Sequence, residues 1–184
     1  MKIGVLSDTH GNITALKRAL DLFANVDLIV HAGDVLYHPP RLGCTEGYDV
    51  VACVNLLNGL DIPVVIAQGN CDAAVYEELL EMPVQSPYAY VVHDSSSIIV
   101  SHGHTLSRQQ MIDLGERYGA DYFISGHTHV PVLEKVGGLV LMNPGSPAIP
   151  KYQIDGRLIP SVGFIDDDGA RIVDLDAEKT IVNI

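Results

Sequence analysis

The chain has 184 residues, a formal net charge of −12 and 47% hydrophobic residues. This length suits one domain, and we expect residues 1–184 to form a single domain. The acidic charge argues against a nucleic-acid partner, which normally requires a basic surface, and no apolar run approaches the roughly 18 residues that a membrane span needs.

The first half of the chain alternates strands and helices. The predicted elements are strands near 2–7, 27–31 and 63–67 and helices near 13–24, 49–58 and 73–80. Repetition of strand, loop and helix is typical of an α/β domain with a largely parallel sheet, so these helices should cover the sheet. The segment from Pro39 to Gly47 is rich in proline and glycine and is expected to be an exposed loop.

From about residue 84 the chain becomes rich in strands, with one helix predicted near 107–118. Alternating apolar and polar residues predict strands near 88–92, 98–101, 121–125, 131–136, 139–142, 161–165, 170–175 and 180–183. Gly137-Gly138 and Asp168-Gly169 lie between such segments, where tight turns need the positive φ angles that glycine adopts without strain. We therefore expect antiparallel hairpins near the C-terminus.

Five of the predicted strands end in short polar clusters. These clusters are Ser7-Asp8-Thr9-His10, Gly33-Asp34, Gly69-Asn70-Cys71-Asp72, Ser101-His102-Gly103-His104 and Gly126-His127-Thr128-His129. Ligands of open α/β sheets bind beyond the carboxyl ends of the strands, so we expect the clusters to converge there. In extended backbone, the i, i+2 spacing within Asp8-x-His10 and His127-x-His129 would turn both side chains of each pair toward one centre.

The candidate metal ligands combine imidazole with oxygen donors. They are Asp8, His10, Asp34, Asn70, His102, His127 and His129. This mixture suits Mn²⁺, Fe, Zn²⁺, Co²⁺ or Ni²⁺ and is poorly suited to Ca²⁺. Seven ligands are too many for one tetrahedral ion, whereas a bridging carboxylate would let two ions share them at a separation of roughly 3.5–4 Å. Paired ions at this spacing stabilise displacement at phosphorus, so the set predicts phosphoester hydrolysis.

Taken together, the motifs D-x-H, G-D, G-N-x-D, S-H-G-H and G-H-x-H resemble those of the calcineurin-like metallophosphoesterases. The resemblance extends from Asp8 through Asn143-Pro144-Gly145-Ser146 and is greatest to the small bacterial YfcE-like phosphodiesterases. It implies an α/β fold in which two mixed β-sheets form a sandwich flanked by helices. It also implies Mn²⁺ as the preferred activator and a homo-oligomer, either a dimer or a tetramer.

The resemblance also implies a role for each ligand. Asp8, His10, Asp34 and His129 would bind the first metal, and Asp34, Asn70, His102 and His127 the second, which makes Asp34 the bridge. A hydroxide held by the two ions would then attack the phosphorus of a small or activated phosphodiester.

The sequence departs from the family pattern at Cys71, where many relatives have a histidine that protonates the leaving oxygen. A thiol is a weak hydrogen-bond donor and a poor substitute for imidazolium. We expect either that esters with good leaving groups are hydrolysed best or that His104 or His38 supplies the proton. Asp72 is expected to support its neighbours or to begin a helix, and His31 and His93 to be structural or solvent-facing.

Two other functions would be compatible with this fold. A nuclease would use the same metal chemistry but would need a basic groove, which a charge of −12 disfavours. A non-catalytic scaffold for protein interactions would be favoured by degraded ligands, and here all seven are present. The three cysteines form no C-x-x-C pair and the N-terminus does not resemble a secretory signal, so we expect reduced thiols and a cytoplasmic location.

Overall fold

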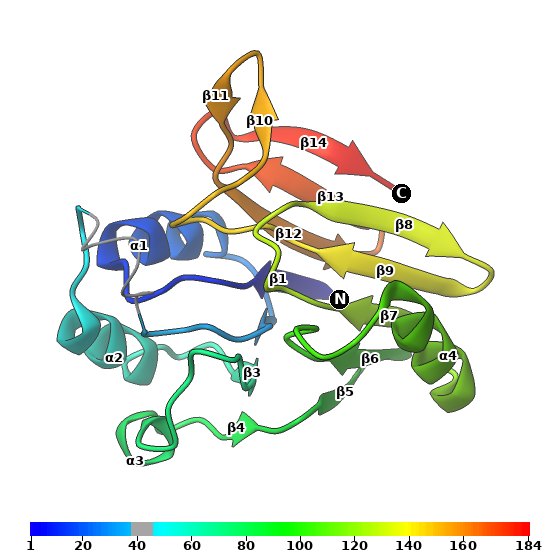
Figure 1. Cartoon of the computed structure of the whole chain (residues 1–184), viewed down its shortest axis with the longest axis horizontal. Coiled ribbons are helices and arrows are strands. Elements are labelled where there is room, and N and C mark those ends of the chain that lie inside the picture. Colours follow the sequence, from blue (N-terminus) through cyan, green and yellow to red (C-terminus); the bar gives the residue numbers. More distant parts are fainter. Residues whose placement is uncertain (38–45) are drawn as a thin grey trace.

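The structure is a computed structural model that describes residues 1–37 and 46–184. Two β-sheets pack face to face, and helices cover their outer sides (Figure 1). Within the described residues the larger sheet has seven strands, in the order β14 (Lys179–Asn183), β13 (Gly169–Asp174), β12 (Ser161–Asp166), β1 (Lys2–Leu6), β2 (Leu28–His31), β3 (Val64–Ala67) and β4 (Val84–Gln85). The smaller sheet has five described strands, in the order β5 (Ala89–His93), β6 (Ser96–Val100), β7 (Tyr122–Ile124), β9 (Leu139–Asn143) and β8 (Val132–Val136).

Both sheets are mixed. Strands β1 to β4 run parallel, and β12, β13 and β14 add an antiparallel meander beside β1. In the smaller sheet β6, β7 and β9 are parallel, and β5 and β8 pair antiparallel at the two edges. A separate hairpin of β10 (Gln153–Ile154) and β11 (Arg157–Leu158) projects from the larger sheet (Figure 1).

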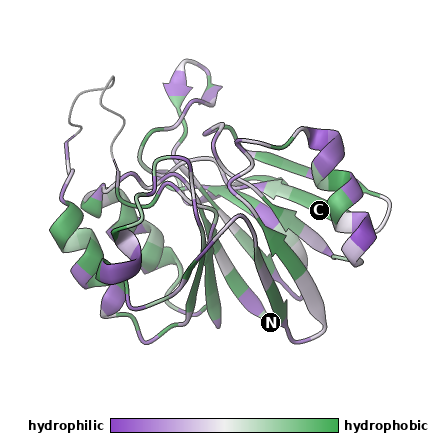
Figure 2. Cartoon of the chain, turned by 60° about the horizontal axis from the view of Figure 1, so that its bottom comes forward, coloured by the Kyte–Doolittle hydropathy of each residue, from purple (hydrophilic) through white to green (hydrophobic). Residues whose placement is uncertain are grey.

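The helices lie on opposite sides of this sandwich. Helices α1 (Ile13–Leu22), α2 (Val50–Asn58) and α3 (Tyr76–Leu79) belong to the half that contains β1 to β4, and α4 (Arg108–Tyr118) covers the smaller sheet. Asn12, Asp49 and Ser107 cap α1, α2 and α4 by accepting backbone N–H groups. Figure 2 shows the strands as mainly hydrophobic and placed between these helical layers.

Apolar side chains on alternate faces of the strands form three apolar layers. In β1, Ile3 and Val5 face the smaller sheet, whereas Leu6 packs with the cluster beneath α1 and α2. In β7, Ile124 lies between the sheets while Phe123 packs beneath α4. Because successive side chains of a strand point to opposite faces, each buried strand supplies two layers at once.

The predicted fold class, an α/β sandwich of two mixed sheets flanked by helices, is confirmed. The helix expected at 73–80 is shorter, because only Tyr76–Leu79 is helical and residues before it form turns. The turn expected at Asp168-Gly169 is formed by residues 167–168, and Gly169 already belongs to β13. Strands β4, β10 and β11 have only two residues each and were not predicted.

Two of the sequence predictions lie largely or wholly outside the described residues. They concern the loop from Pro39 to Gly47, of which only the last two residues are described, and His38. In the described part of the chain, no helix has both the length and the apolar character needed to cross a membrane.

Candidate metal centre

The five polar clusters meet at one edge of the sandwich. They follow the carboxyl ends of β1, β2 and β3 in the larger sheet and of β6 and β7 in the smaller sheet. These strands are parallel neighbours within each sheet, so the loops after them leave from the same edge. This placement confirms that the clusters converge, as parallel topology requires.

The local backbone at these clusters differs from the extended conformation that was expected. Asp8, His10, Asp34, His127 and His129 all have positive φ angles, between 46° and 68°. The left-handed conformation is unfavourable for residues with a Cβ atom and is typical of functional sites where surrounding contacts impose it. Both side chains of each i, i+2 pair still reach the cluster, but they do so through left-handed turns.

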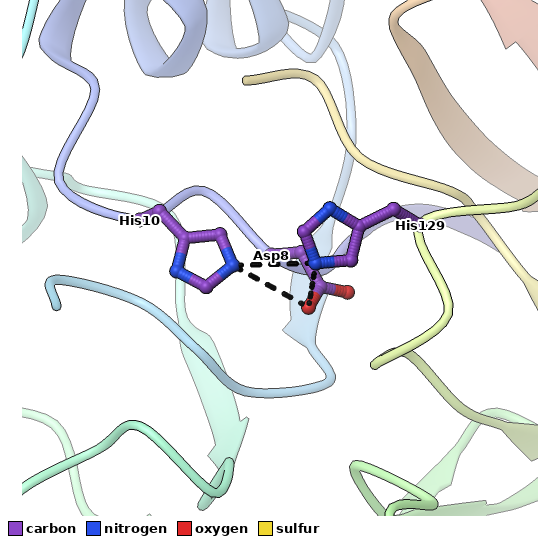
Figure 3. Close-up of side chains that lie close together, drawn as sticks. All are labelled: Asp8, His10 and His129. Carbon is purple, nitrogen blue, oxygen red and sulfur yellow. Dashed lines mark hydrogen bonds and ion pairs between the residues drawn. The ribbon is translucent and has the colours of Figure 1, made fainter. Parts of the chain in front are cut away.

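The first group of candidate ligands comprises Asp8, His10 and His129, whose polar atoms point toward one another (Figure 3). Asp8 Oδ1 lies 3.8 Å from His10 Nε2 and 3.2 Å from His129 Nε2. The two imidazole nitrogens are 3.4 Å apart. Three donor atoms from β1 and β7 loops therefore face a common point.

A second group shares Asp8 with the first. Asp34 Oδ2 lies 3.3 Å from His102 Nε2 and 3.9 Å from His10 Nε2, so this oxygen faces both groups. Asn70 Oδ1 lies 3.1 Å from His102 Nε2, and Asp8 Oδ1 lies 4.0 Å from the same nitrogen. The carboxylates thus lie between the two sets of histidines.

The tautomers of three histidines are fixed by backbone carbonyls. Nδ1–H donates from His10 to Tyr37 O at 2.6 Å, from His102 to Ala32 O at 2.7 Å and from His129 to Ile149 O at 2.6 Å. The lone pair of a neutral imidazole is then on Nε2, the atom that faces the cluster in each case. Such carbonyl partners commonly orient histidines that bind metals.

Each carboxylate uses one oxygen for anchoring and presents the other. Asp8 Oδ2 accepts from Ser7 Oγ at 2.6 Å and from the His127 N–H at 2.9 Å, and Asp34 Oδ1 accepts from the Cys71 N–H at 2.8 Å. Asp8 Oδ1 is completely enclosed and, among the described residues, is the buried side-chain polar atom that lacks a hydrogen bond. An unsatisfied buried oxygen surrounded by imidazole nitrogens is the environment that a bound cation would satisfy.

Two glycines allow this close packing. A Cβ atom on Gly126 would lie 1.8 Å from Ser7 Oγ, and one on Gly69 would lie 2.1 Å from Asp34 Oδ1. Neither distance is compatible with a side chain, so the glycines of the G-N and G-H motifs bring backbone directly against the carboxylates.

The electrostatic environment keeps both carboxyls ionised. Burial alone would raise the pKa of Asp34, but His102, the Cys71 N–H and His10 outweigh burial and lower its pKa. Burial is likewise outweighed at Asp8, whose pKa is lowered by His129, His102 and Ser7. Burial lowers the pKa of His10 and favours the neutral imidazole that can bind a metal.

The remaining candidates lie at the exposed side of the cluster. The His127 ring centroid is 5.2 Å from that of His102, and the His104 ring centroid is 5.5 Å from that of His102 and 6.0 Å from that of His127. His104 is exposed, and its ring lies beside those of two candidate ligands. Burial and the charge of Asp34 raise the pKa of the Cys71 thiol to about 12, which makes it a poor proton donor.

Asp72 accepts hydrogen bonds from the backbone beside the candidate ligands. Its Oδ2 accepts from the N–H groups of Asp34 and Gly69, both at 2.8 Å, and its Oδ1 accepts from the Val35 N–H at 2.8 Å. The expectation that Asp72 supports its neighbours is confirmed. The alternative role at a helix N-terminus is wrong, because α3 begins at Tyr76 and has Val75 at its N-cap.

Buried polar side chains that no motif indicated also hold the loops. His31 accepts from the Gly33 N–H at Nδ1 (3.1 Å), and its Nε2–H donates to Thr9 Oγ1 (2.9 Å), which donates in turn to Val35 O. Ser146 Oγ donates to Asp8 O at 2.8 Å. His31 is therefore buried and structural, as expected. The loop that contains Ser146 packs against the end of β1 from the C-terminal half of the chain.

The donor set fits divalent transition metals. It provides imidazole nitrogens of fixed tautomer, two ionised carboxylates and one amide oxygen, which is the mixture that such ions prefer. Two overlapping groups, Asp8 with His10 and His129 and Asp8 with Asp34 and His102, each bring three ligand atoms within 4.8 Å of one another. The two groups overlap at Asp8.

Comparison with known proteins gives a consistent result. The sequence profile of the calcineurin-like phosphoesterase superfamily domain matches residues 1–159. The phosphodiesterase YfcE of Escherichia coli K12 is 34% identical over 186 aligned residues, which cover 100% of this chain and 97% of that protein. A probable metallophosphoesterase of Methanothermobacter thermautotrophicus is 35% identical, with 97% of this chain and 91% of that protein covered. The solved structure of YfcE, described as a phosphoesterase, matches with a TM-score of 0.85 and 33% identity over 100% of this chain and 98% of that one.

Proposed function

Because the chain belongs to the calcineurin-like phosphoesterase superfamily and is a metal-dependent phosphoric ester hydrolase, we propose that it is a phosphodiesterase that uses two divalent metal ions. Its substrate is a small or activated phosphodiester. The observation that carries the proposal is the buried, unsatisfied Asp8 Oδ1 between two groups of imidazole nitrogens.

The ligands divide between two sites. Asp8, His10, Asp34 and His129 hold the first ion, and Asp34, Asn70, His102 and His127 hold the second. The short distances among Asp8, His10 and His129 support the first site, and those from His102 to Asp34 and Asn70 support the second. Asp34 Oδ2 lies 3.9 Å from His10 Nε2 and 3.3 Å from His102 Nε2, which supports its role as the bridge. Mn²⁺ is the preferred ion, and Fe, Zn²⁺, Co²⁺ and Ni²⁺ are compatible with the same donors.

When bound, the two ions supply Lewis acidity at phosphorus and a water of lowered pKa as the nucleophile. The protein contributes the fixed orientation of its ligands, since three histidines and both carboxylates are anchored by backbone or by Ser7. Anchoring removes the cost of reorganising these groups during the reaction.

His104 is the protein group placed to meet the substrate. Its ring lies beside His102 and His127 and is exposed, so it can donate a hydrogen bond to a phosphate oxygen or a proton to the leaving oxygen. Cys71 contributes little to protonation because a thiol is a weak hydrogen-bond donor. Esters whose leaving groups need no protonation should therefore react fastest.

The test is hydrolysis of bis(p-nitrophenyl) phosphate by metal-stripped protein after addition of Mn²⁺, Zn²⁺, Ni²⁺ or Mg²⁺. Mn²⁺ should restore turnover, and Asn70→Ala should lower kcat/KM by about tenfold or more, the usual order for lost support at a metal site. Asn183→Ala, at the end of β14 and remote from the cluster, is the matched control and should retain activity. Folded protein that is inactive with every metal, or full activity of Asn70→Ala, would contradict the proposal.

A further inference from the structure

A pocket of about 270 Å³ lies beside the metal centre, between α4, β8 and the loops that follow β6 and β7. Gly103, Gly126 and Thr128 contribute to its wall. Gly103 is bonded in the chain to His102 and His104, and Gly126 and Thr128 flank His127. The segments that carry the candidate ligands therefore also form one side of the pocket.

The wall next to the ligands is held in a fixed conformation. Asn143 Nδ2 donates to Gly126 O at 2.7 Å and to Thr128 Oγ1 at 3.1 Å. Gly103 has a φ of +84°, and a Cβ atom there would lie 2.9 Å from Met111 Cε, so the α4 side chain packs directly against this loop. The pocket is thus formed by the folded structure without any ligand.

The rest of the lining is mainly apolar and carries no net charge, with Ser125 as an uncharged polar member. Leu106, Met111 and Val132 supply accessible hydrocarbon and thioether surface, whereas Phe123 and Leu141, also in the lining, are buried. The charged members of the lining are Arg108 and Glu134, and these neutralise each other through an ion pair in which Arg108 Nε lies 3.0 Å from Glu134 Oε2. Such a lining favours an uncharged apolar group and offers no unpaired charge to a second phosphate.

The volume limits the size of the occupant. A cavity of about 150 Å³ in another protein binds benzene, so a pocket of about 270 Å³ accommodates a group of one or two rings. A flat aromatic group suits the partly exposed Met111, since thioethers make favourable contacts with rings.

We propose that this pocket binds the substituent of the phosphodiester that does not leave, and that this substituent is an uncharged aromatic group of one or two rings. The inference rests on the proposed phosphodiesterase function and specifies its substrate class. The phosphate lies at the metal centre, one ester oxygen carries the leaving group outward, and the other directs its substituent past Thr128 into the pocket. Monoesters lack this second substituent, so they gain nothing from the pocket.

The test compares two esters with the same leaving group, methyl p-nitrophenyl phosphate and phenyl p-nitrophenyl phosphate. Burial of the phenyl ring should raise kcat/KM for the phenyl ester by about tenfold or more over the methyl ester. Val132→Trp, which places a large side chain in the pocket, should reduce this ratio toward one. Val132 is 43% exposed on the edge strand β8, so the larger side chain is compatible with folding, which a thermal melt verifies.

Val92→Trp is the matched control, because Val92 is 66% exposed on β5, the opposite edge strand of the same sheet. It should leave the ratio unchanged. Leu106→Ala enlarges the pocket. It should raise kcat/KM for naphthyl p-nitrophenyl phosphate relative to that for the phenyl ester. Equal kcat/KM for the methyl and phenyl esters in the unaltered protein would overturn the subsite while leaving the phosphodiesterase intact. The same conclusion would follow if Val132→Trp left the phenyl-to-methyl ratio unchanged and Leu106→Ala left the naphthyl-to-phenyl ratio unchanged. Failure to hydrolyse either ester with any metal would overturn the phosphodiesterase itself.

Discussion

Asp72→Asn tests whether the metal centre depends on support from a residue that does not face it. The carboxylate of Asp72 is buried and accepts three backbone N–H groups, from Asp34, Val35 and Gly69. An asparagine of the same shape has one acceptor oxygen, so at least one buried N–H would face an amide NH₂. Loss of a charged hydrogen bond and one or two unsatisfied donors should cost about 2–5 kcal/mol of unfolding free energy.

The same substitution should weaken metal binding, because Asp72 holds the backbone of the proposed bridging ligand Asp34. We expect the Kd for Mn²⁺, measured by titration calorimetry, to rise about 10- to 100-fold. Urea denaturation of the metal-free protein measures the stability change. Asp113→Asn, in the exposed part of α4, is the control and should change neither quantity. A stability loss below about 1 kcal/mol together with an unchanged Kd would refute this supporting role.

Two further predictions follow from perturbed pKa values. Burial lowers the pKa of His31 to about 4 from about 6.5, so the unfolded state binds the extra proton between these values and stability falls as the pH falls through this window. Between pH 6.5 and 4 the unfolding free energy should decrease by about 3 kcal/mol more in the unaltered protein than in His31→Gln, and parallel pH profiles would contradict this. The pKa of Cys71 is raised to about 12, so at pH 8 iodoacetamide should alkylate it at least about tenfold more slowly than it alkylates a free thiol. The rate is measured in metal-free protein in which another of the three cysteines, Cys44, is replaced by serine (Cys44→Ser). Rapid labelling of Cys71, located by peptide mapping, would show that its thiol is not suppressed.

The sequence predicted the arrangement of the strands well because the apolar alternation is strong. Residues such as Ile3, Val5 and Leu6 in β1 divide between two apolar layers, and this division determines the orientation of the strand. Short elements carried too little signal, since β4, β10 and β11 have two residues each. Their pairing depends on distant segments of the chain.

The polar clusters were predicted to converge, but their local geometry was not. Asp8 and His129 adopt positive φ angles that tertiary contacts impose, including the Ser146 hydrogen bond to Asp8 O and the Ile149 carbonyl at His129 Nδ1. These contacts join segments more than a hundred residues apart in one case and about twenty in the other. The three backbone hydrogen bonds that Asp72 accepts could not be predicted either, because the sequence does not show which backbone N–H groups a side chain will meet.

The central claim, that two metal ions share one centre, is tested most directly by metal stoichiometry. Metal-stripped protein would be equilibrated with Mn²⁺, freed of excess ion and analysed by elemental mass spectrometry against protein concentration. The account predicts two ions per chain in the unaltered protein and in Asp113→Asn, and at most one in Asp34→Asn, which lacks the proposed bridge. A single ion per chain in the unaltered protein at saturating Mn²⁺ would contradict it.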